Sequence, residues 1–471
     1  MLGKLKPSIT EKTKEAPPEI VSKDDVETGQ IESLDEAELF LQEHGVANTQ
    51  LQEMLNDPEK SNRLRRRVDR ILLPLLCGTY CLQYIDKQAL SYSAVFDLFT
   101  DANISSDQYS WLASLFYFDF PSFYQYPANL AAPITPCFMM IVGMWYLRQE
   151  QPFRAGCFYA CNGVGSMLGG LITYGIGQMD SFPVWRGVFL ICGGITIIWG
   201  VILLIFLPNS ILTAKRFTVE EKILLIGRGK QNQTGILNRK IKWYQIREAL
   251  VDPQIWLLFL FTLLNETING GVANFGKLII KGLVSSPLLT TALGIPQGAF
   301  QVFFVLSGGY LSSRFKNART IIMVIYLCPT IIGISLLWQL PRSNRYGVLF
   351  GYYILGAYVS SLVLALQMPS TNTAGYTKRV TSTAFVFLAY CIGNIIGPHA
   401  FLAEEAPIYR TGCKLILACA LCQIACAIAL RLLLISRNRR RDKMELPAGE
   451  QEEQMMEDLT DFENPRFRYV L

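Results

Sequence analysis

Residues 187–207 read GVFLICGGITIIWGVILLIFL and contain no charged side chain. A helix of this length rises about 30 Å, which matches the hydrocarbon core of a bilayer. Nine further stretches are similarly long and apolar, so we predict an all-α polytopic membrane protein. The ten predicted spans are roughly 70–90, 108–130, 155–177, 185–207, 254–276, 288–311, 320–340, 346–366, 380–402 and 412–435, and a shorter apolar stretch covers 131–147.

Charged side chains are scarce and gather at the two ends of the chain. They make up 17% of the residues, whereas soluble domains average about 25%. This pattern excludes an ordinary cytosolic enzyme and a wholly disordered protein. The acidic stretch 444–465 is itself predicted to be disordered. We predict a disordered cytoplasmic tail at 1–66, an incomplete N-terminal helix bundle at 67–207, a cytoplasmic linker at 208–253, a six-helix C-terminal bundle at 254–436 and an acidic cytoplasmic tail at 437–471.

Basic residues flank both the first and the last predicted span. Residues 63–70 contain five arginines, and residues 437–443 contain four arginines and a lysine. Because loops rich in Lys and Arg stay in the cytoplasm, we expect both termini to be cytoplasmic, which requires an even number of spans. The net charge of +5 arises mostly in the inner loops, so nucleic acid is not an expected partner.

Two glycine-rich segments occupy similar places in the two halves. Residues 165–170 read GSMLGG and residues 393–398 read GNIIGP, each with glycines four apart inside a span. This spacing lets helix backbones approach closely. Its presence in both halves favours a transporter built from structural repeats.

Several segments, in order, resemble one family. They are RRVDRILLPLL at 66–76, YIDK at 84–87, MWYLRQEQP at 144–152, NGG at 269–271, LIIKG at 278–282 and YCIGNIIGP at 390–398. These segments resemble fungal allantoate-permease-like transporters, in the anion:cation symporter group of the major facilitator superfamily. The resemblance implies a two-bundle fold and a monomer in the plasma membrane. It also implies uptake of a small organic anion, such as allantoate, a ureido compound or a vitamin-like carboxylate, driven by a proton gradient without a cofactor.

The chain departs from that family in two places. The superfamily's Gly-x-Leu-x-Asp-Arg loop occurs once, as GYLSSR at 309–314, with Ser313 in place of aspartate. The resemblance makes Ser313 and Arg314 candidates for a gate. The other copy is absent, since 127–130, which resembles the end of the second helix, abuts 132–136, which resembles the middle of the fourth. We therefore expect ten full spans plus a short, bent or re-entrant remnant at 131–147, instead of twelve spans.

Polar side chains inside spans are candidates for binding substrate or protons, because hydrocarbon makes them costly unless they serve a function. Glu266 is the preferred one, together with Asn265 and Asn269, which are four residues apart and share a helix face. Gln297 and Gln301 have the same spacing. The full set is Asp86, Lys87, Asn162, Asn265, Glu266, Asn269, Gln297, Gln301, Asn394 and His399.

Several of these residues also have purely structural interpretations. Asp86 and Lys87 are also explained as an ion pair at the membrane interface. Asn162 and Asn394 are suited to hydrogen bonds between helices, and His399 to capping a helix end. Outside this set, Asp119 is a further candidate proton carrier. Lys277 and Lys281, near the end of a span, are candidates for attracting anions, but extension toward the lipid headgroups explains them more simply and is what we expect.

The motifs of other functional classes do not occur in the sequence. It has no Walker motif and no metal-ligand spacing in the apolar body, so we predict neither an enzyme, a metal site nor an ATP-driven pump. Secondary transport of an organic anion with protons is the leading hypothesis. The alternative is a non-transporting membrane protein, either a sensor or the truncated product of an incorrect gene model that lacks a segment near residues 130–131.

Overall fold

The fold is all-α throughout the part of the chain that the structure describes. The computed structural model describes residues 40–41, 43–45, 51, 54–55, 57–96, 98–115, 134–147, 149–178, 183–208, 211–231, 241–284, 286–443 and 459–471. Within these residues, eight helical segments are long and apolar enough to cross a membrane. The predicted fold class is therefore confirmed, as is the multi-pass character of the protein.

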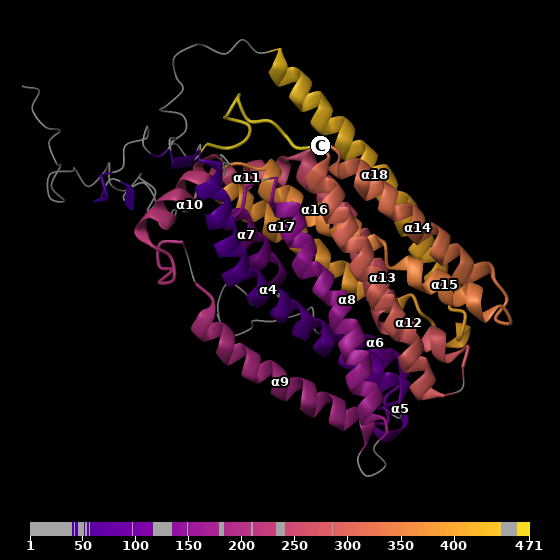
Figure 1. Cartoon of the computed structure of the whole chain (residues 1–471). Coiled ribbons are helices and arrows are strands. Elements are labelled where there is room, and N and C mark those ends of the chain that lie inside the picture. Colours follow the sequence, from indigo (N-terminus) through magenta and orange to yellow (C-terminus); the bar gives the residue numbers. More distant parts are fainter. Residues whose placement is uncertain are drawn as a thin grey trace, which may run out of the picture.

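The helices fall into two halves separated by a linker with two short helices (Figure 1). The first half contains α4 (Pro58–Val95), α5 (Leu98–Asp101), α6 (Ser106–Leu115), α7 (Ile134–Trp145), α8 (Gln151–Ile176) and α9 (Val184–Phe206). The linker contains α10 (Val219–Gln231) and α11 (Trp243–Val251). The second half contains α12 (Pro253–Lys281), α13 (Pro287–Arg314), α14 (Arg319–Gln339), α15 (Arg345–Leu355), α16 (Tyr358–Asn372), α17 (Tyr376–His399), η2 (Ala403–Glu405) and α18 (Arg410–Asp442).

Three of the long helices begin with the same local signal, a polar capping residue followed by proline. The Asp57 carboxylate accepts a hydrogen bond from the backbone N–H of Glu59 at 2.9 Å. Asp252 caps α12 and Ser286 caps α13 in the same way. Proline fits the first helical position because its missing N–H has no partner there. These signals fix where the spans begin.

Every predicted span except 108–130 coincides with a described helix or, for 346–366, with the consecutive helices α15 and α16. Only the beginning of 108–130, as part of α6, lies within the described residues. The predicted short remnant at 131–147 corresponds to α7, which has 12 residues. A helix of that length rises about 18 Å, too little to cross a core of about 30 Å. The exact number of spans stays a prediction.

The linker marks one side of the molecule, which we call the linker side; the opposite side is the far side. Arg67 near the start of α4 pairs with Glu221 of α10 at 2.6 Å. Arg437 near the end of α18 pairs with Asp252 at 2.6 Å. The start of α4 and the end of α18 therefore lie on the linker side, where the C-terminus also lies (Figure 1).

Close glycine contacts join the long helices. A Cβ atom on Gly163 of α8 would lie 2.4 Å from the carbonyl oxygen of Gly298 on α13, so the two halves touch backbone to backbone there. The two predicted glycine segments make the same kind of contact within each half. Gly165 abuts Cys81 of α4, and Gly397 abuts Thr267 of α12.

The last residues of the chain, 459–471, pack against the linker side of the second half. Asn372 at the end of α16 exchanges two hydrogen bonds with the backbone of Val470, at 2.9 and 2.8 Å. Phe467 and Tyr469 are buried. The prediction of disorder over 444–465 is therefore wrong for its last residues, because this segment brings aromatic side chains that the helix ends can bury. Residues 444–458 lie outside the described residues.

A buried ion cluster holds this C-terminal segment in place. Lys378 near the start of α17 has no exposed side-chain area and pairs with Asp461 at 2.6 Å and with Glu248 of α11 at 2.7 Å. Asp461 also accepts a hydrogen bond from the hydroxyl of Tyr469 at 2.7 Å. Burial and the neighbouring Asp461 carboxylate raise the pKa of Tyr469, so its hydroxyl stays a donor. The cluster joins the linker, α17 and the C-terminus.

Replacement of Asp461 by alanine is expected to destabilise the protein. It leaves the buried Lys378 ammonium with less counter-charge, and breaking a buried pair costs about 3 kcal/mol. The matched control is Asp442→Ala, because Asp442 pairs with Arg468 at 3.0 Å on an exposed surface, where a pair contributes about 1 kcal/mol or less. Thermal unfolding of the detergent-purified variants measures the difference. Equal melting temperatures for the two variants would contradict a stabilising role for the buried cluster.

Both ends of the chain are expected to face the same compartment. The start of α4 and the C-terminal residues lie on the linker side, and the basic clusters assign that side to the cytoplasm. Reporter tags at the two ends, tested for protease access in intact cells, should both be protected. Tags on opposite sides of the membrane would show that α7 and the residues before it cross differently.

Candidate functional site

A small polar cavity lies between the two halves of the protein. It is about large enough for one water molecule. The side chains around it carry hydroxyl and amide groups and come from helices of both halves. The polar lining residues are Tyr84 and Gln88 of α4, Gln297 and Gln301 of α13, Tyr352 of α15 and Tyr358 of α16.

Hydrogen bonds join several side chains of the cavity lining. The side-chain oxygen of Gln88 on α4 accepts from Lys277 of α12, across the two halves. The Tyr352 hydroxyl donates to the side-chain oxygen of Gln297. The structure thus places Gln297 and Gln301, the two glutamines predicted from their spacing, in the wall of a cavity.

Glu266 lies at the centre of a fully buried polar cluster next to this cavity. Its Oε2 accepts hydrogen bonds from Asn269 at 2.8 Å and from Asn394 of α17 at 2.5 Å. The hydroxyl of Tyr358, which lines the cavity, donates to Asn269 at 3.1 Å. The other carboxylate oxygen, Oε1, has no hydrogen-bond partner among the described residues. A carboxylate oxygen without a hydrogen-bond partner can bind a proton.

Lys87 and Asp86 have different surroundings, although they are adjacent in sequence. The charge of Lys87 on α4 interacts with that of Glu266 on α12, across the two halves. Asp86 instead accepts a hydrogen bond from Thr196 of α9 at 2.6 Å. Asp86 therefore belongs to packing within the first half, whereas the charge of Lys87 acts on Glu266.

Lys277 is buried, contrary to the expectation that it extends to lipid headgroups. Its side chain is 3% exposed, and its ammonium donates a hydrogen bond to the side-chain oxygen of Gln88. The ammonium also lies 3.5 Å from the centre of the Tyr92 ring. The expectation failed because α4 covers this face of α12. Lys281, one turn later, is exposed and donates to the backbone oxygen of Val95 at 2.9 Å.

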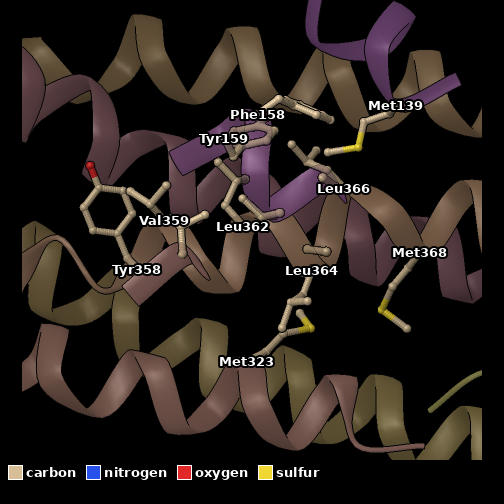
Figure 2. Close-up of a cluster of buried hydrophobic side chains, with 14 of the residues drawn as sticks. Met139, Phe158, Tyr159, Met323, Tyr358, Val359, Leu362, Leu364, Leu366 and Met368 are labelled. Atoms are coloured by element: carbon tan, nitrogen blue, oxygen red, sulfur yellow. The ribbon is translucent and has the colours of Figure 1, made fainter. Parts of the chain in front are cut away.

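On the linker side of the cavity, α16 contributes a layer of apolar side chains (Figure 2). Leu366 of α16 lies beside Met139 of α7, and Leu362 lies near Tyr159 of α8. All four residues belong to one buried cluster, to which Phe158 also belongs. This layer joins the two halves between the polar cavity and the linker side.

Three other predicted site residues lie away from the cavity. Asn265 faces α18 and α16, where its amide donates to Gln423 at 2.8 Å and to the backbone oxygen of Tyr358 at 3.3 Å. Asn162 lies on α8 beside Gly163 and does not line the cavity. His399 is exposed at the end of α17, with its ring 4.9 Å from that of Trp111.

The candidate gate residues lie at the linker-side end of α13. The Ser313 hydroxyl donates to the backbone oxygen of Gly309, one turn earlier in its own helix, at 2.9 Å. Arg314 is exposed. The buried arginine of this region is Arg319, which donates to Thr371 at 3.1 Å and whose backbone N–H donates to Leu471. Asp119, the further proton-carrier candidate, lies outside the described residues.

The sequence analysis missed five polar residues of this region, all on α4, α15 or α16. Tyr84, Gln88 and Tyr92 recur every four residues along α4, which puts them on one helix face. That spacing was a usable signal. Tyr352 and Tyr358 carry no such pattern, and tyrosine is common near membrane interfaces, so only the packing of the helices identifies them.

Comparison with known proteins places the chain in a family. The model of the Major Facilitator Superfamily matches residues 128–398. An uncharacterized transporter of Schizosaccharomyces pombe is 34% identical, and the match covers 95% of this chain and 94% of that relative. Allantoate permease of Saccharomyces cerevisiae is 31% identical, over 88% of this chain and 87% of the permease.

The alignment with the S. pombe relative spans 503 positions, more than the 471 residues of this chain. That relative therefore has residues without a counterpart here. Among solved structures, a bacterial homologue of the human lysosomal transporter Spinster, inward-facing and unoccupied, has a TM-score of 0.47 at 15% identity. That match covers 80% of this chain and 98% of the homologue.

An all-helical membrane fold in two halves, with a polar cavity between them, defines the class of secondary transporters. The chain belongs to the major facilitator superfamily. The resemblance noted in the sequence is confirmed, since allantoate permease is among the relatives.

Proposed function

We propose that this transporter moves a small organic anion together with protons into the cell across the plasma membrane, as a monomer with cytoplasmic termini. No cofactor and no covalent chemistry are involved, because the proton gradient supplies the driving force. One observation carries the proposal: Glu266 is buried, its charge interacts with that of Lys87 in the opposite half, and one of its carboxylate oxygens has no hydrogen-bond partner among the described residues.

Charge balance explains how one proton and one anion are coupled at this place. When Glu266 is ionised, its charge offsets that of Lys87 across the two halves. When Glu266 is protonated, that offset is lost and the positive potential between the halves rises, which favours an anion there. By linkage, a bound anion favours protonation to the same extent. Binding both leaves the net charge of the buried region unchanged.

Protonation also weakens the attraction between the two halves. The electrostatic attraction between Lys87 of α4 and Glu266 of α12 acts between the halves, and it requires the ionised form of Glu266. The transition between open states is then easiest when Glu266 carries a proton and an anion is bound. Asn269 and Asn394 can hold Oε2 in either state, since an amide N–H donates both to a carboxylate and, more weakly, to the carbonyl oxygen of a carboxylic acid.

Two features of the relatives and of the cavity support an organic anion. One relative is named allantoate permease, and allantoate is a small carboxylate with ureido groups. The cavity is lined by amide and hydroxyl groups, which hydrogen-bond such a solute. Allantoate is therefore the first solute to test.

Replacement of Glu266 by glutamine is expected to abolish the coupling. Glutamine keeps the size of the side chain but cannot change charge, so we expect proton-driven allantoate uptake to fall about tenfold or more and to lose its dependence on external pH. The control Glu404→Gln alters an exposed carboxylate outside the spans and should leave uptake unchanged. Uptake by Glu266→Gln that still rises as the pH falls would remove Glu266 from the mechanism.

A second candidate function, a non-transporting membrane protein, is favoured by one observation. Helix α7 is too short to cross the bilayer, and the S. pombe relative has residues that this chain lacks. A first half without its third helix and part of its fourth leaves the flanks of α6 and α7 without their usual neighbours. This arrangement impairs the movement of one half against the other.

We accordingly expect the 471-residue form to transport poorly and a lengthened form to transport well. The lengthened form takes the missing segment near residues 130–131 from the S. pombe relative. Both are expressed in a permease-deficient yeast, and organic-anion uptake is measured for each, with the Glu266→Gln version of each as the background. Equal uptake by the two forms would show that the shorter first half is sufficient for transport.

A further inference from the structure

We infer that Lys277, together with Gln88, binds the carboxylate of the transported solute, and that the solute is a small monocarboxylate bearing amide or ureido groups. This inference rests on the proposed function and deepens it. The observation behind it is the buried ammonium of Lys277, which lies at the boundary of the two halves, next to the polar cavity. The groups that this ammonium contacts are neutral.

Lys277 lacks the carboxylate partner that other buried cations have: Lys378 has Asp461 at 2.6 Å and Arg228 has Glu150 at 2.6 Å. The buried Arg319 and Arg441 also donate to neutral oxygens, but they lie at the linker-side ends of α14 and α18, away from the polar cavity. The contacts of the Lys277 ammonium within the described residues are the side-chain oxygen of Gln88 and the face of the Tyr92 ring. A desolvated charge without a counter-charge is costly in a protein interior, so this cation is suited to an anion that arrives from outside.

The surroundings hold Lys277 in place from both halves. The Tyr92 hydroxyl donates to the backbone oxygen of Ser166 on α8 at 2.6 Å, and Gly169 lies against the Tyr92 ring. The ring is therefore fixed between α8 and the ammonium. Lys277 itself is one helical turn beyond Ala273, which lines the cavity. The ammonium thus lies at the far-side end of the cavity in a defined position.

The position of Gln88 connects the cation to the cavity. Its side chain lines the cavity, as that of Tyr84 does, and accepts a hydrogen bond from Lys277. An ammonium has three N–H donors, and the hydrogen bond to Gln88 uses one of them. A carboxylate in an enlarged cavity reaches the remaining donors from the same side as Gln88.

The rest of the lining indicates what the remainder of the solute carries. Gln297, Gln301, Tyr84 and Tyr352 offer amide and hydroxyl groups but no charge. These groups pair with neutral donors and acceptors such as those of amides and ureas. The charge of Lys87 already interacts with that of Glu266, which leaves Lys277 as the cation for a single negative charge on the solute.

Ligand-induced thermal stabilisation of the full 471-residue protein, purified in detergent, tests the assignment without requiring transport. The probes are three acids, allantoate, ureidoacetate and nicotinate, and three neutral counterparts, allantoin, hydantoin and nicotinamide. A ligand that binds the folded state raises the melting temperature with its concentration. We expect at least one acid to do so and its neutral counterpart not to.

Four variants separate anion binding from a structural role of Lys277. Lys277→Gln should lower the affinity for the acid about tenfold or more, whereas Lys277→Arg keeps the charge and part of the affinity. Gln88→Glu gives Lys277 an internal counter-charge of nearly the same shape, so it should fold, raise the melting temperature without ligand and lose the acid. Lys281→Gln, which removes an exposed lysine one turn away, should bind like the wild type.

Several results would overturn the assignment. They are acid binding by Lys277→Gln or by Gln88→Glu with wild-type affinity, equal stabilisation by acids and neutral counterparts, and a wild type that none of the acids stabilises. Because no proton gradient is used, these results are independent of the coupling mechanism. Acid binding that depends on Lys277, combined with uptake indifferent to Glu266, would leave this inference standing while the proposed coupling fails.

Discussion

A charged side chain inside the apolar body of this protein needs a partner within the protein, because hydrocarbon offers none. The position of the two halves follows from this constraint. The charge of Glu266 on α12 interacts with that of Lys87 on α4, and Lys277 of α12 donates a hydrogen bond to Gln88 of α4. In both cases the partners come from opposite halves, so these interactions form only when α4 and α12 lie side by side. The same groups that make the site therefore also align the halves.

Glycine makes that alignment sterically possible, and it does so in the same way in each half. In the first half α8 lies against α4 through Gly165, and in the second half α17 lies against α12 through Gly397. These contacts bring Asn394 of α17 within hydrogen-bond distance of Glu266. Gly163 and Gly298 then let α8 and α13 meet between the halves. A repeated architecture with a polar seam between the repeats is the arrangement from which rocking transporters are built.

The sequence was sufficient for features that depend on length, periodicity and local signals. The spans followed from apolar length, and Gln297 and Gln301 were found by their spacing of four. Lys277 was misassigned because a lysine near a helix end satisfies itself equally well at the headgroups or against a neighbouring helix, and only the position of α4 decides between them. The prediction of disorder for the C-terminal segment was based on its many acidic residues. Its order instead depends on tertiary contacts that composition does not reveal: Asp461 pairs with Lys378, and Phe467 and Tyr469 are buried against the ends of α16 and α18.

A first half that lacks a segment, as proposed above, would affect binding and transport differently. The cavity is lined by residues of α4, α12, α13, α15 and α16, which lie within the described residues. Helix α7 contributes Met139 to the apolar layer on the linker side, but it does not line the cavity. A solute site formed by these five helices therefore does not depend on residues next to α7. Movement of one half against the other makes a different demand, because a half rotates as a unit only if its helices pack against one another over the thickness of the membrane. Binding an anion and carrying it across the membrane are therefore separable properties of this architecture.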